Sequence, residues 1–415
     1  MHITTFGALL GLFIAIILII KHFQPVYSLM IGALIGGVFG GASLVSTIDF
    51  MIIGASDISP SILRVLASGI LAGCLIKTGS VDKISESIIN LLGNNNSILG
   101  IALSSMVLAG VGVNLDVAII TVAPVGLHIG KKLNYSKLTV LLALAGGGKA
   151  GNIISPNPNT LAVAENFNVE LSNVMISNIV PSIFGIILTI ILAKSLINKG
   201  SKIEVNKVEE NKALPSLLSS LIGPFTAILL LFLSNISDIV IDPLIALPIG
   251  GITCLIATKN LSHINEYFSF GLYQMQGVCI LLLGTGTLAG IIQASTLQQS
   301  TIHLLEILGI SQFLLAPISG MIMSLATASS TAGATIASST FSDAILNSGL
   351  SSLDGASIVN AGASTFEQFP HGSLFHTSAK SVNMDIKERF KLLPYEVAIG
   401  TIMTIISTFM CFISL

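Results

Sequence analysis

Long apolar runs alternate with short polar turns along almost the whole chain, and their lengths suit membrane crossing. A helix of about 20 mostly apolar residues spans the hydrocarbon layer. Runs of this kind, whole or interrupted, are Thr4–Ile20, Val26–Val45, Pro60–Ile76, Ser97–Val113, Val117–Gly130, Leu138–Ala164, Val174–Ile197, Leu217–Ser234, Ile239–Ala257, Gln274–Ala294, Gln312–Ala326, Thr327–Ser342, Ser357–Ser373 and Glu396–Leu415. They predict an all-α polytopic membrane protein with about 11 to 14 membrane segments, counting re-entrant ones.

A polar segment divides the chain almost at its middle, and its four lysines favour the cytoplasmic side. Lysine-rich turns around residues 131–137 and 387–391 are expected on the same side. The predicted organisation is an N-terminal helix (1–25), a first transmembrane repeat (26–197), a cytoplasmic linker (198–215) and a second transmembrane repeat (216–415).

The two halves share an order of features. Ser68–Gly73 has a counterpart in Thr285–Gly290, and each is followed by a short amphipathic stretch, another apolar run and a glycine-rich polar segment. The spacing between counterparts stays at about 216 residues, as expected of a duplicated fold. The pattern therefore predicts two inverted structural repeats with broken helices or re-entrant hairpins.

Composition agrees with a membrane protein and excludes several function classes. Hydrophobic residues make up 52% of the 415 and charged residues only 9%, with a mean hydropathy of +0.91. Soluble domains are about a quarter charged, so this chain lacks the polar surface that water requires. The net charge of −2 carries no basic patch for nucleic acid. No nucleotide loop or nucleophile–base pair is found, which argues against an ATP-driven pump and an enzyme.

Glycine-rich polar segments interrupt the apolar pattern at matching places, Gly146–Thr160 and Asn360–Ser373. Lipid cannot hydrogen-bond an opened backbone, so such a break must be buried in protein or line a watery cavity. Pro156 and Pro158 prevent a continuous helix through the first segment. Paired breaks in two halves indicate the binding site of a secondary transporter.

Polar side chains near the breaks are the candidate substrate ligands. Amides, hydroxyls and one cation gather in the first break, and hydroxyls gather in the second half. The predicted substrate-binding residues are Lys149, Asn152, Ser155, Asn157, Asn159, Thr160, Ser329, Ser330, Thr331 and Ser364. Lys149 could pair with an anionic substrate, Asp116 or Glu165, or extend to water. The small residues of the second half could equally serve close helix packing.

Three ionisable residues are candidates for proton coupling: Asp116, Glu367 and His371. A carboxylate at membrane depth is costly unless paired or solvated, so it favours a functional role. Asp116 in a surface loop is the alternative. The i, i+5 spacing of His371 and His376 suits no metal pair, so neither a metal site nor a catalytic residue is predicted.

Arg64 and the cysteines are interpreted as structural. Arg64 lies near Asp49 and Asp57 in sequence, and we expect these three side chains to pair. The four cysteines sit in apolar runs without ligand spacing, so they are expected to be buried apolar side chains.

The chain resembles the gluconate:proton symporter (GntP) family over nearly its whole length. The resemblance rests on Leu115-Asp116-Val117 with the following Ala123-Pro124-Val125, on the proline-rich turn Ser155–Ala164, and on the runs Ala361–Ser364 and Pro370–Phe375. It implies a proton-coupled importer of sugar acids or related small hydroxy-carboxylates in the bacterial inner membrane.

Departures from the family pattern leave the substrate and ion open. Asn157, Asn159 and Thr160 stand where the gluconate members mostly have Pro and Gly, His371 where an aspartate is usual, and Lys149 where an apolar residue is expected. The amide and hydroxyl oxygens could hold sodium instead.

We therefore predict a secondary symporter that works by alternating access, with its site between the two breaks. The expected partners are a small anionic organic substrate and the lipid bilayer, with no nucleic acid and no cofactor besides the coupling ion, H⁺ or alternatively Na⁺. A homo-oligomer is compatible with the sequence. The alternatives are a cation/proton antiporter, a sodium-coupled carboxylate transporter, a membrane-embedded enzyme and a passive channel.

Overall fold

The computed structural model describes residues 3–21, 23–203, 214–233, 237, 239–297, 300, 312–370 and 372–414. Over these ranges the chain is helical, with two isolated β-bridges and no strand. The predicted all-α fold is confirmed.

The helices follow one another with short connections. In the first half they are α1 (Thr5–Ile20), α2 (Pro25–Phe39), α3 (Leu44–Asp57), α4 (Ser59–Lys77), α5 (Ser80–Leu92), η1 (Asn94–Asn96), α6 (Ser97–Gly110), α7 (Leu115–Lys132), α8 (Lys137–Asn152), α9 (Pro158–Asn166), α10 (Leu171–Ser177) and α11 (Ile179–Ser195). In the second half they are α12 (Leu217–Leu231), α13 (Pro243–Ala257), η3 (Leu261–His263), α14 (Ile264–Gln293), η4 (Gln312–Leu314), α16 (Leu315–Thr327), α17 (Ser330–Asn347), α18 (Ser352–Ala363), α19 (Ser373–Ser381), α20 (Ile386–Arg389), η5 (Phe390–Leu392) and α21 (Leu393–Ser414).

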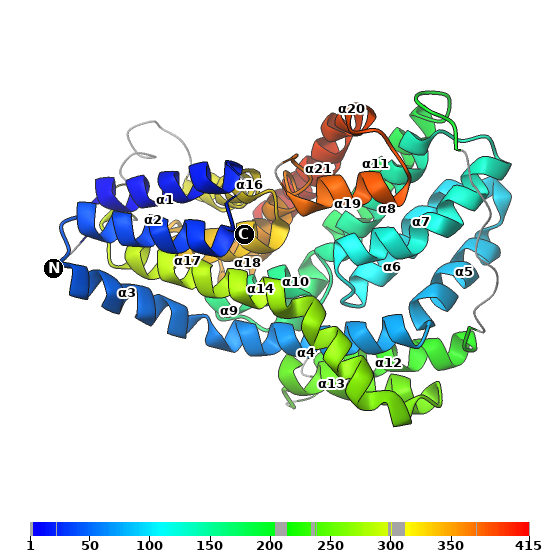
Figure 1. Cartoon of the computed structure of the whole chain (residues 1–415), viewed down its shortest axis with the longest axis horizontal. Coiled ribbons are helices and arrows are strands. Elements are labelled where there is room, and N and C mark those ends of the chain that lie inside the picture. The colour runs from blue at the N-terminus through cyan, green and yellow to red at the C-terminus, as the bar shows by residue number, and fades with distance from the viewer. Residues whose placement is uncertain are drawn as a thin grey trace.

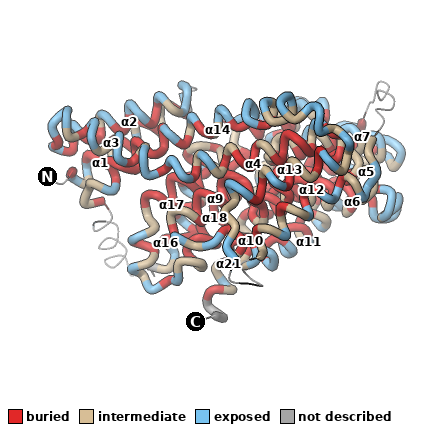
Figure 2. Tube along the Cα trace, turned by 90° about the horizontal axis from the view of Figure 1, so that it is seen from below, coloured by how far each residue is buried: buried red, intermediate tan, exposed pale blue. Residues whose placement is uncertain are grey.

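The molecule is elongated, with α1 and α2 at one end and α5, α6 and α7 at the other (Figure 1). Helices α9, α17 and α18 lie in the interior, and Figure 2 shows their traces as largely buried. The four cysteines are buried, as predicted.

Among the described residues, three helical segments are long and apolar enough to cross a membrane, or five if each of two bent pairs counts as one span. Five shorter apolar helices accompany them. Buried breaks and short helices are tolerated at membrane depth where protein surrounds them.

The sequence did not predict α3, which belongs to the longest apolar segment. The run Val26–Val45 was predicted as a single span, but Gly41 has a φ of +97°, and the Ser43 hydroxyl caps α3 by accepting from Ser46 N at 3.1 Å. α3 continues into α4 to give 34 residues, Leu44–Lys77. The polar residues of α3 dilute its apolar pattern, so the prediction began only at Pro60.

Glycines allow this long segment to pack directly against α14. Backbone atoms of Gly286 and Gly290 leave no room for a Cβ on Gly54, and Gly271 faces Gly69 in the same way. Small residues permit such close approach of membrane helices. Residue numbers fall along α14 as they rise along α3 and α4, so the two segments are antiparallel.

Corresponding helices of the two halves recur at a constant interval. The starting residues of three pairs are each 215 residues apart: Leu115 and Ser330 (α7, α17), Lys137 and Ser352 (α8, α18), Pro158 and Ser373 (α9, α19). By the same order α3–α4 corresponds to α14, and these run antiparallel. Both observations support the predicted inverted repeat.

The breaks are shorter than predicted, because the glycines before them are helical. α8 extends to Asn152, and Gly147 and Gly151 on one face contact the carbonyl groups of Ala102 and Met106 on α6. These glycines therefore serve helix packing. The first break covers residues 153–157, and α9 begins at Pro158, where a missing N–H costs nothing.

The second break lies between Ala363, the last residue of α18, and Ser373, the first residue of α19; His371 in this interval lies outside the described residues. A third, shorter break separates α16 from α17, because Ala328 has a left-handed φ of +46°. It falls inside the predicted stretch Thr327–Ser342.

The lysine-rich turns predicted on one side of the membrane are in contact. Lys202 Nζ donates to the Asn134 carbonyl at 2.6 Å, Lys137 Nζ donates to the Asn383 carbonyl at 2.5 Å, and Ser201 N donates to Glu388 at 2.7 Å. These contacts support a common side for the three turns. Residues 204–213 of the linker lie outside the described ranges.

Candidate substrate and ion site

A cavity of about 200 Å³ lies among α7, α14, α17 and α19. Five of the predicted site residues line it: Asp116, Ser329, Ser330, Thr331 and Glu367. They come from three separate segments of the chain. The cavity adjoins a second one of about 340 Å³, because both are lined by Leu281, Ala328, Ser329 and Ser373.

Three helices begin at this cavity. Leu115, Ser330 and Ser373 are the first residues of α7, α17 and α19, and all three line it. The first N–H groups of a helix lack intrahelical partners and carry partial positive charge. Within the described residues, neither the α7 nor the α19 N-cap residue makes a side-chain hydrogen bond to the helix, and backbone N–H groups at such starts can bind an anion.

Two carboxylates complete the polar lining. Asp116 lies in the first turn of α7, and its Oδ2 accepts from Ser373 Oγ at 3.3 Å. Glu367 comes from the second break and is buried at 2% exposure. The opposite wall, from Gly277, Val278 and Leu281 of α14, is apolar.

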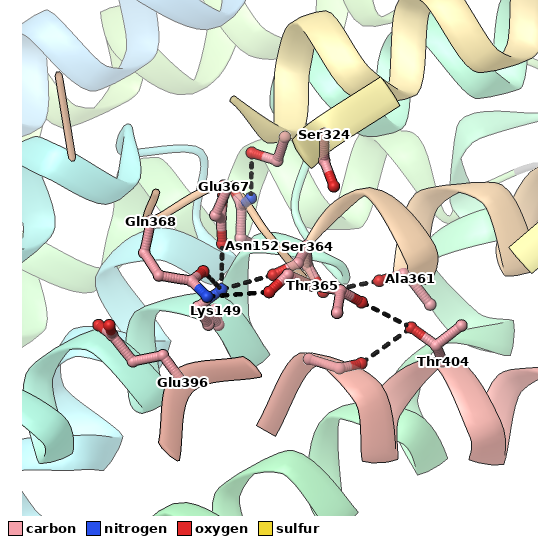
Figure 3. A network of polar contacts seen from close by, with 12 residues as sticks. Lys149, Asn152, Ser324, Ala361, Ser364, Thr365, Glu367, Gln368, Glu396 and Thr404 are labelled. Atoms are coloured by element: carbon pink, nitrogen blue, oxygen red, sulfur yellow. Dashed lines mark hydrogen bonds and ion pairs between the residues drawn. The ribbon is translucent and has the colours of Figure 1, made fainter. Parts of the chain in front are cut away.

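Lys149, in the last turn of α8, contacts the second break (Figure 3). Its Nζ donates to the Ser364 carbonyl at 2.5 Å and to Gln368 Oε1 at 2.6 Å, and it lies 3.1 Å from Glu367 Oε1. That carboxylate oxygen is an ion-pair partner only, since within the described residues it accepts no hydrogen bond. Lys149 is wholly buried and does not line the cavity.

The predicted asparagines form a second buried layer, which we call the asparagine cluster (Asn152, Asn157, Asn159, Asn360). Asn152 Nδ2 donates to Ser330 Oγ at 3.2 Å, and Asn159 Nδ2 donates to Asn360 Oδ1 at 2.8 Å. Asn157 donates to the Asn152 carbonyl at 2.8 Å. The cluster joins the first break and its flanking helices to α17 and α18 rather than lining the cavity.

The remaining predicted residues also lie in this buried layer. Thr160 donates its hydroxyl and its backbone N–H to Asn157 Oδ1, so Asn157 caps α9. Ser364 Oγ donates to the Ala361 carbonyl at 2.7 Å. Ser155 Oγ is buried, and it has no hydrogen-bond partner within the described residues.

Sequence reasoning missed four residues of this region: Asn114, Ser373, Gln368 and Asn360. Asn114 and Ser373 immediately precede or begin helices, and that position is the signal that could have selected them. Gln368 and Asn360 are polar residues of the second polar segment that tertiary contacts bring to Lys149 and Asn159.

The expected pairing of Arg64 is wrong. Its guanidinium pairs with Glu165 and lies 2.8 Å from Asp242 Oδ2, whereas Asp49 and Asp57 are exposed on α3. Helix α13 and the end of α9 pack against α4, and this packing brings Asp242 and Glu165 to Arg64 although they are distant from it in sequence. This triad lines a separate cavity of about 290 Å³, and it engages the Glu165 that was considered for Lys149.

The chain has clear relatives among known proteins. A family model described as GntP family permease matches residues 3–248, more than half of the chain. A Haemophilus influenzae protein named an uncharacterized transporter is 50% identical over 98% of this chain and 97% of its own length. A second protein of that organism, named an uncharacterized permease, is 26% identical over 55% of this chain and 51% of its own.

These relatives and the helical architecture define a multi-pass membrane transporter, not an enzyme. The chain belongs to the GntP family of permeases. The crystal structure of the Alcanivorax borkumensis YdaH transporter, reported to have an unusual topology, shares this fold with a TM-score of 0.67 over 88% of both chains. Its sequence is only 12% identical, so the likeness concerns the fold alone.

Proposed function

We propose that this transporter carries gluconate-like sugar acids or other small hydroxy-carboxylates together with protons, by alternating access, in the bacterial inner membrane. The observation that carries the proposal is the convergence of three helix N-termini on one cavity that also holds Asp116 and Glu367.

The substrate carboxylate would lie at the start of α19, which has no side-chain cap, whereas Ser329 caps α17. Backbone N–H groups at such positions bind anions without a lysine or arginine. The hydroxyls of Ser329, Ser330 and Thr331 line the same cavity and match a substrate that carries hydroxyl groups. A volume of about 200 Å³ lies below the usual ligand pocket of about 300–1,000 Å³, which favours a substrate of few atoms.

Proton coupling follows from charge at the cavity. An ionised Asp116 repels an incoming carboxylate, since like charges at short range in a poorly solvated site interact strongly. A proton on Asp116 removes that repulsion. Proton binding and anion binding therefore favour each other, as symport requires. Glu367 is paired with Lys149, so we assign the proton to Asp116 first.

An antiporter is the second candidate, because two carboxylates at one cavity could also exchange a cation for protons. The helix N-termini argue against a cation there.

The test is uptake of labelled gluconate by proteoliposomes under an imposed inward proton gradient, with glycerate, D-serine and citrate as unlabelled competitors. We expect gradient-driven uptake that at least one hydroxy-acid competitor suppresses. No uptake, together with no competition in a binding assay, would contradict the hydroxy-carboxylate assignment.

The matched variants are Asp116→Asn and Asp49→Asn. Asn at 116 keeps the shape and removes the titrating group, so accumulation driven by the proton gradient should be lost. Asp49 is an exposed carboxylate on α3 and should leave accumulation unchanged. Equal accumulation in both variants would remove Asp116 from the mechanism.

A further inference from the structure

The ammonium group of Lys149 is surrounded by oxygen atoms from the opposite half of the chain. A backbone carbonyl (Ser364), an amide oxygen (Gln368) and a carboxylate oxygen (Glu367) lie 2.5, 2.6 and 3.1 Å from Nζ. Oxygen-only surroundings of this kind are what hard metal cations take in proteins. Glu367 contributes charge without an aligned hydrogen bond, which a spherical cation would use equally well.

The ammonium group of Lys149 also lies at a position that suits a cation. Lys149 lies in the last turn of α8, and Ser364 is the C-cap of α18. The carbonyl ends of helices carry partial negative charge. In transporters built from broken helices, C-terminal half-helix ends and unwound carbonyls coordinate the coupling cation.

The two halves are not equivalent at this point. Lys149 and Ser364 are 215 residues apart, the same interval that separates corresponding helices. The first half therefore supplies a lysine where the second half supplies a serine, and one ammonium serves the ends of both broken helices.

We propose that Lys149 is a built-in cation that occupies the place of a sodium ion between α8 and α18, and thereby frees the transporter from sodium. Its positive charge neutralises Glu367, which lines the cavity on its other side. The statement about coupling rests on the proposed symport function, whereas the occupancy of the site does not.

Two substitutions separate charge from volume. Lys149→Ala removes the ammonium and leaves space beside Glu367 for a small cation. Lys149→Met removes the charge but fills the space with an unbranched apolar chain of similar length. Adding Glu367→Gln to Lys149→Ala also removes the negative charge that would attract the cation.

The experiment measures the thermal unfolding of the detergent-purified, full-length protein in NaCl and in choline chloride at equal ionic strength. A ligand that binds only the folded state raises Tm. We expect NaCl to raise the Tm of Lys149→Ala by several degrees over choline. We expect it to leave the wild type, Lys149→Met and Lys149→Ala/Glu367→Gln unchanged. Methylammonium chloride should act like NaCl on Lys149→Ala, because it returns the lost group.

A folded Lys149→Ala protein whose Tm is the same in all three salts would overturn the proposal. If Lys149→Ala does not fold, sodium binding and uptake by the wild type still test the proposal. Saturable binding of ²²Na⁺ to the wild type would overturn the proposal, and the lack of such binding, with uptake equal in sodium and choline, would support it.

The melting measurements need no substrate, so they test the built-in cation independently of the symport function. Sodium-selective stabilisation of Lys149→Ala without carboxylate uptake by the wild type would overturn the symport function and support the built-in cation.

Discussion

At the residue scale, two fully buried ion pairs have different positions in the fold. Lys149 and Glu367 connect the two halves of the chain, whereas Arg389 and Glu396 lie seven residues apart in the second half. Arg389 contacts Glu396 through two hydrogen bonds of 2.7 and 3.0 Å and also donates to Ser378 on α19. The second pair therefore fixes α19 and α21 around α20.

Removing one partner of that pair should destabilise the protein strongly. Glu396→Gln leaves the Arg389 charge buried without its carboxylate, which costs about 3–5 kcal/mol. The measurement is the free energy of unfolding in denaturant. Glu86→Gln is the control, since the Lys83–Glu86 pair is partly exposed and contributes less than about 1 kcal/mol. Equal effects of the two substitutions would contradict this role.

The hydroxyl of Thr331 offers a test of substrate contact. Thr331→Val keeps the volume and removes the hydroxyl, so one hydrogen bond to a hydroxy acid is lost. That loss is about 1 kcal/mol, and it should raise the KM for gluconate about fivefold. Thr226→Val on α12 is the control, because the Thr226 hydroxyl donates to its own helix. An unchanged KM for Thr331→Val would remove this residue from the substrate site.

Residue types near the breaks were predictable from the sequence, but their partners were not. Polar groups inside apolar runs selected Asp116, Ser329, Ser330 and Glu367, and all four line the cavity. Substrate, Asp116 and Glu165 were considered as partners of Lys149, whereas the structure pairs it with Glu367. Such a contact over more than 200 residues is set by helix packing, which residue spacing does not reveal.

At the element scale, helix packing depends on glycine surfaces. On α14, Gly290 meets the backbone of Phe50 and Gly54, whereas a Cβ at Gly277 would meet nothing within 4 Å. Glycine clusters in this sequence were interpreted as breaks, and several of them are contact faces inside helices. Composition alone does not separate these two roles, because both need a residue without a side chain.

Two substitutions on α14 test this contact. Gly290→Ala forces α3 and α14 apart and should cost about 1–3 kcal/mol of stability. Gly277→Ala should be neutral or stabilising by up to about 1 kcal/mol, since alanine favours helix over glycine. Thermal melting of both variants is the measurement. A Gly290→Ala protein as stable as Gly277→Ala would show that the close approach is not needed.

At the scale of the whole molecule, the two halves line one cavity together. The first half supplies Asp116 and the start of α7, and the second supplies Ser329, Ser330, Glu367 and the starts of α17 and α19. Neither half lines the cavity alone. The shared order of features in the two halves predicted a duplicated fold, and the constant interval of 215 residues between corresponding helices supports it. The prediction from apolar runs missed α3, because polar residues in that helix weaken its apolar pattern.

The central claim is that one cavity couples a hydroxy-carboxylate to a proton, and proton movement tests it most directly. Gluconate is added outside proteoliposomes that contain a pH-sensitive dye, with no gradient imposed. We predict acidification of the interior by the wild type, and none by Asp116→Asn. Proton movement that follows sodium or potassium addition but not gluconate would contradict the claim and favour an antiporter.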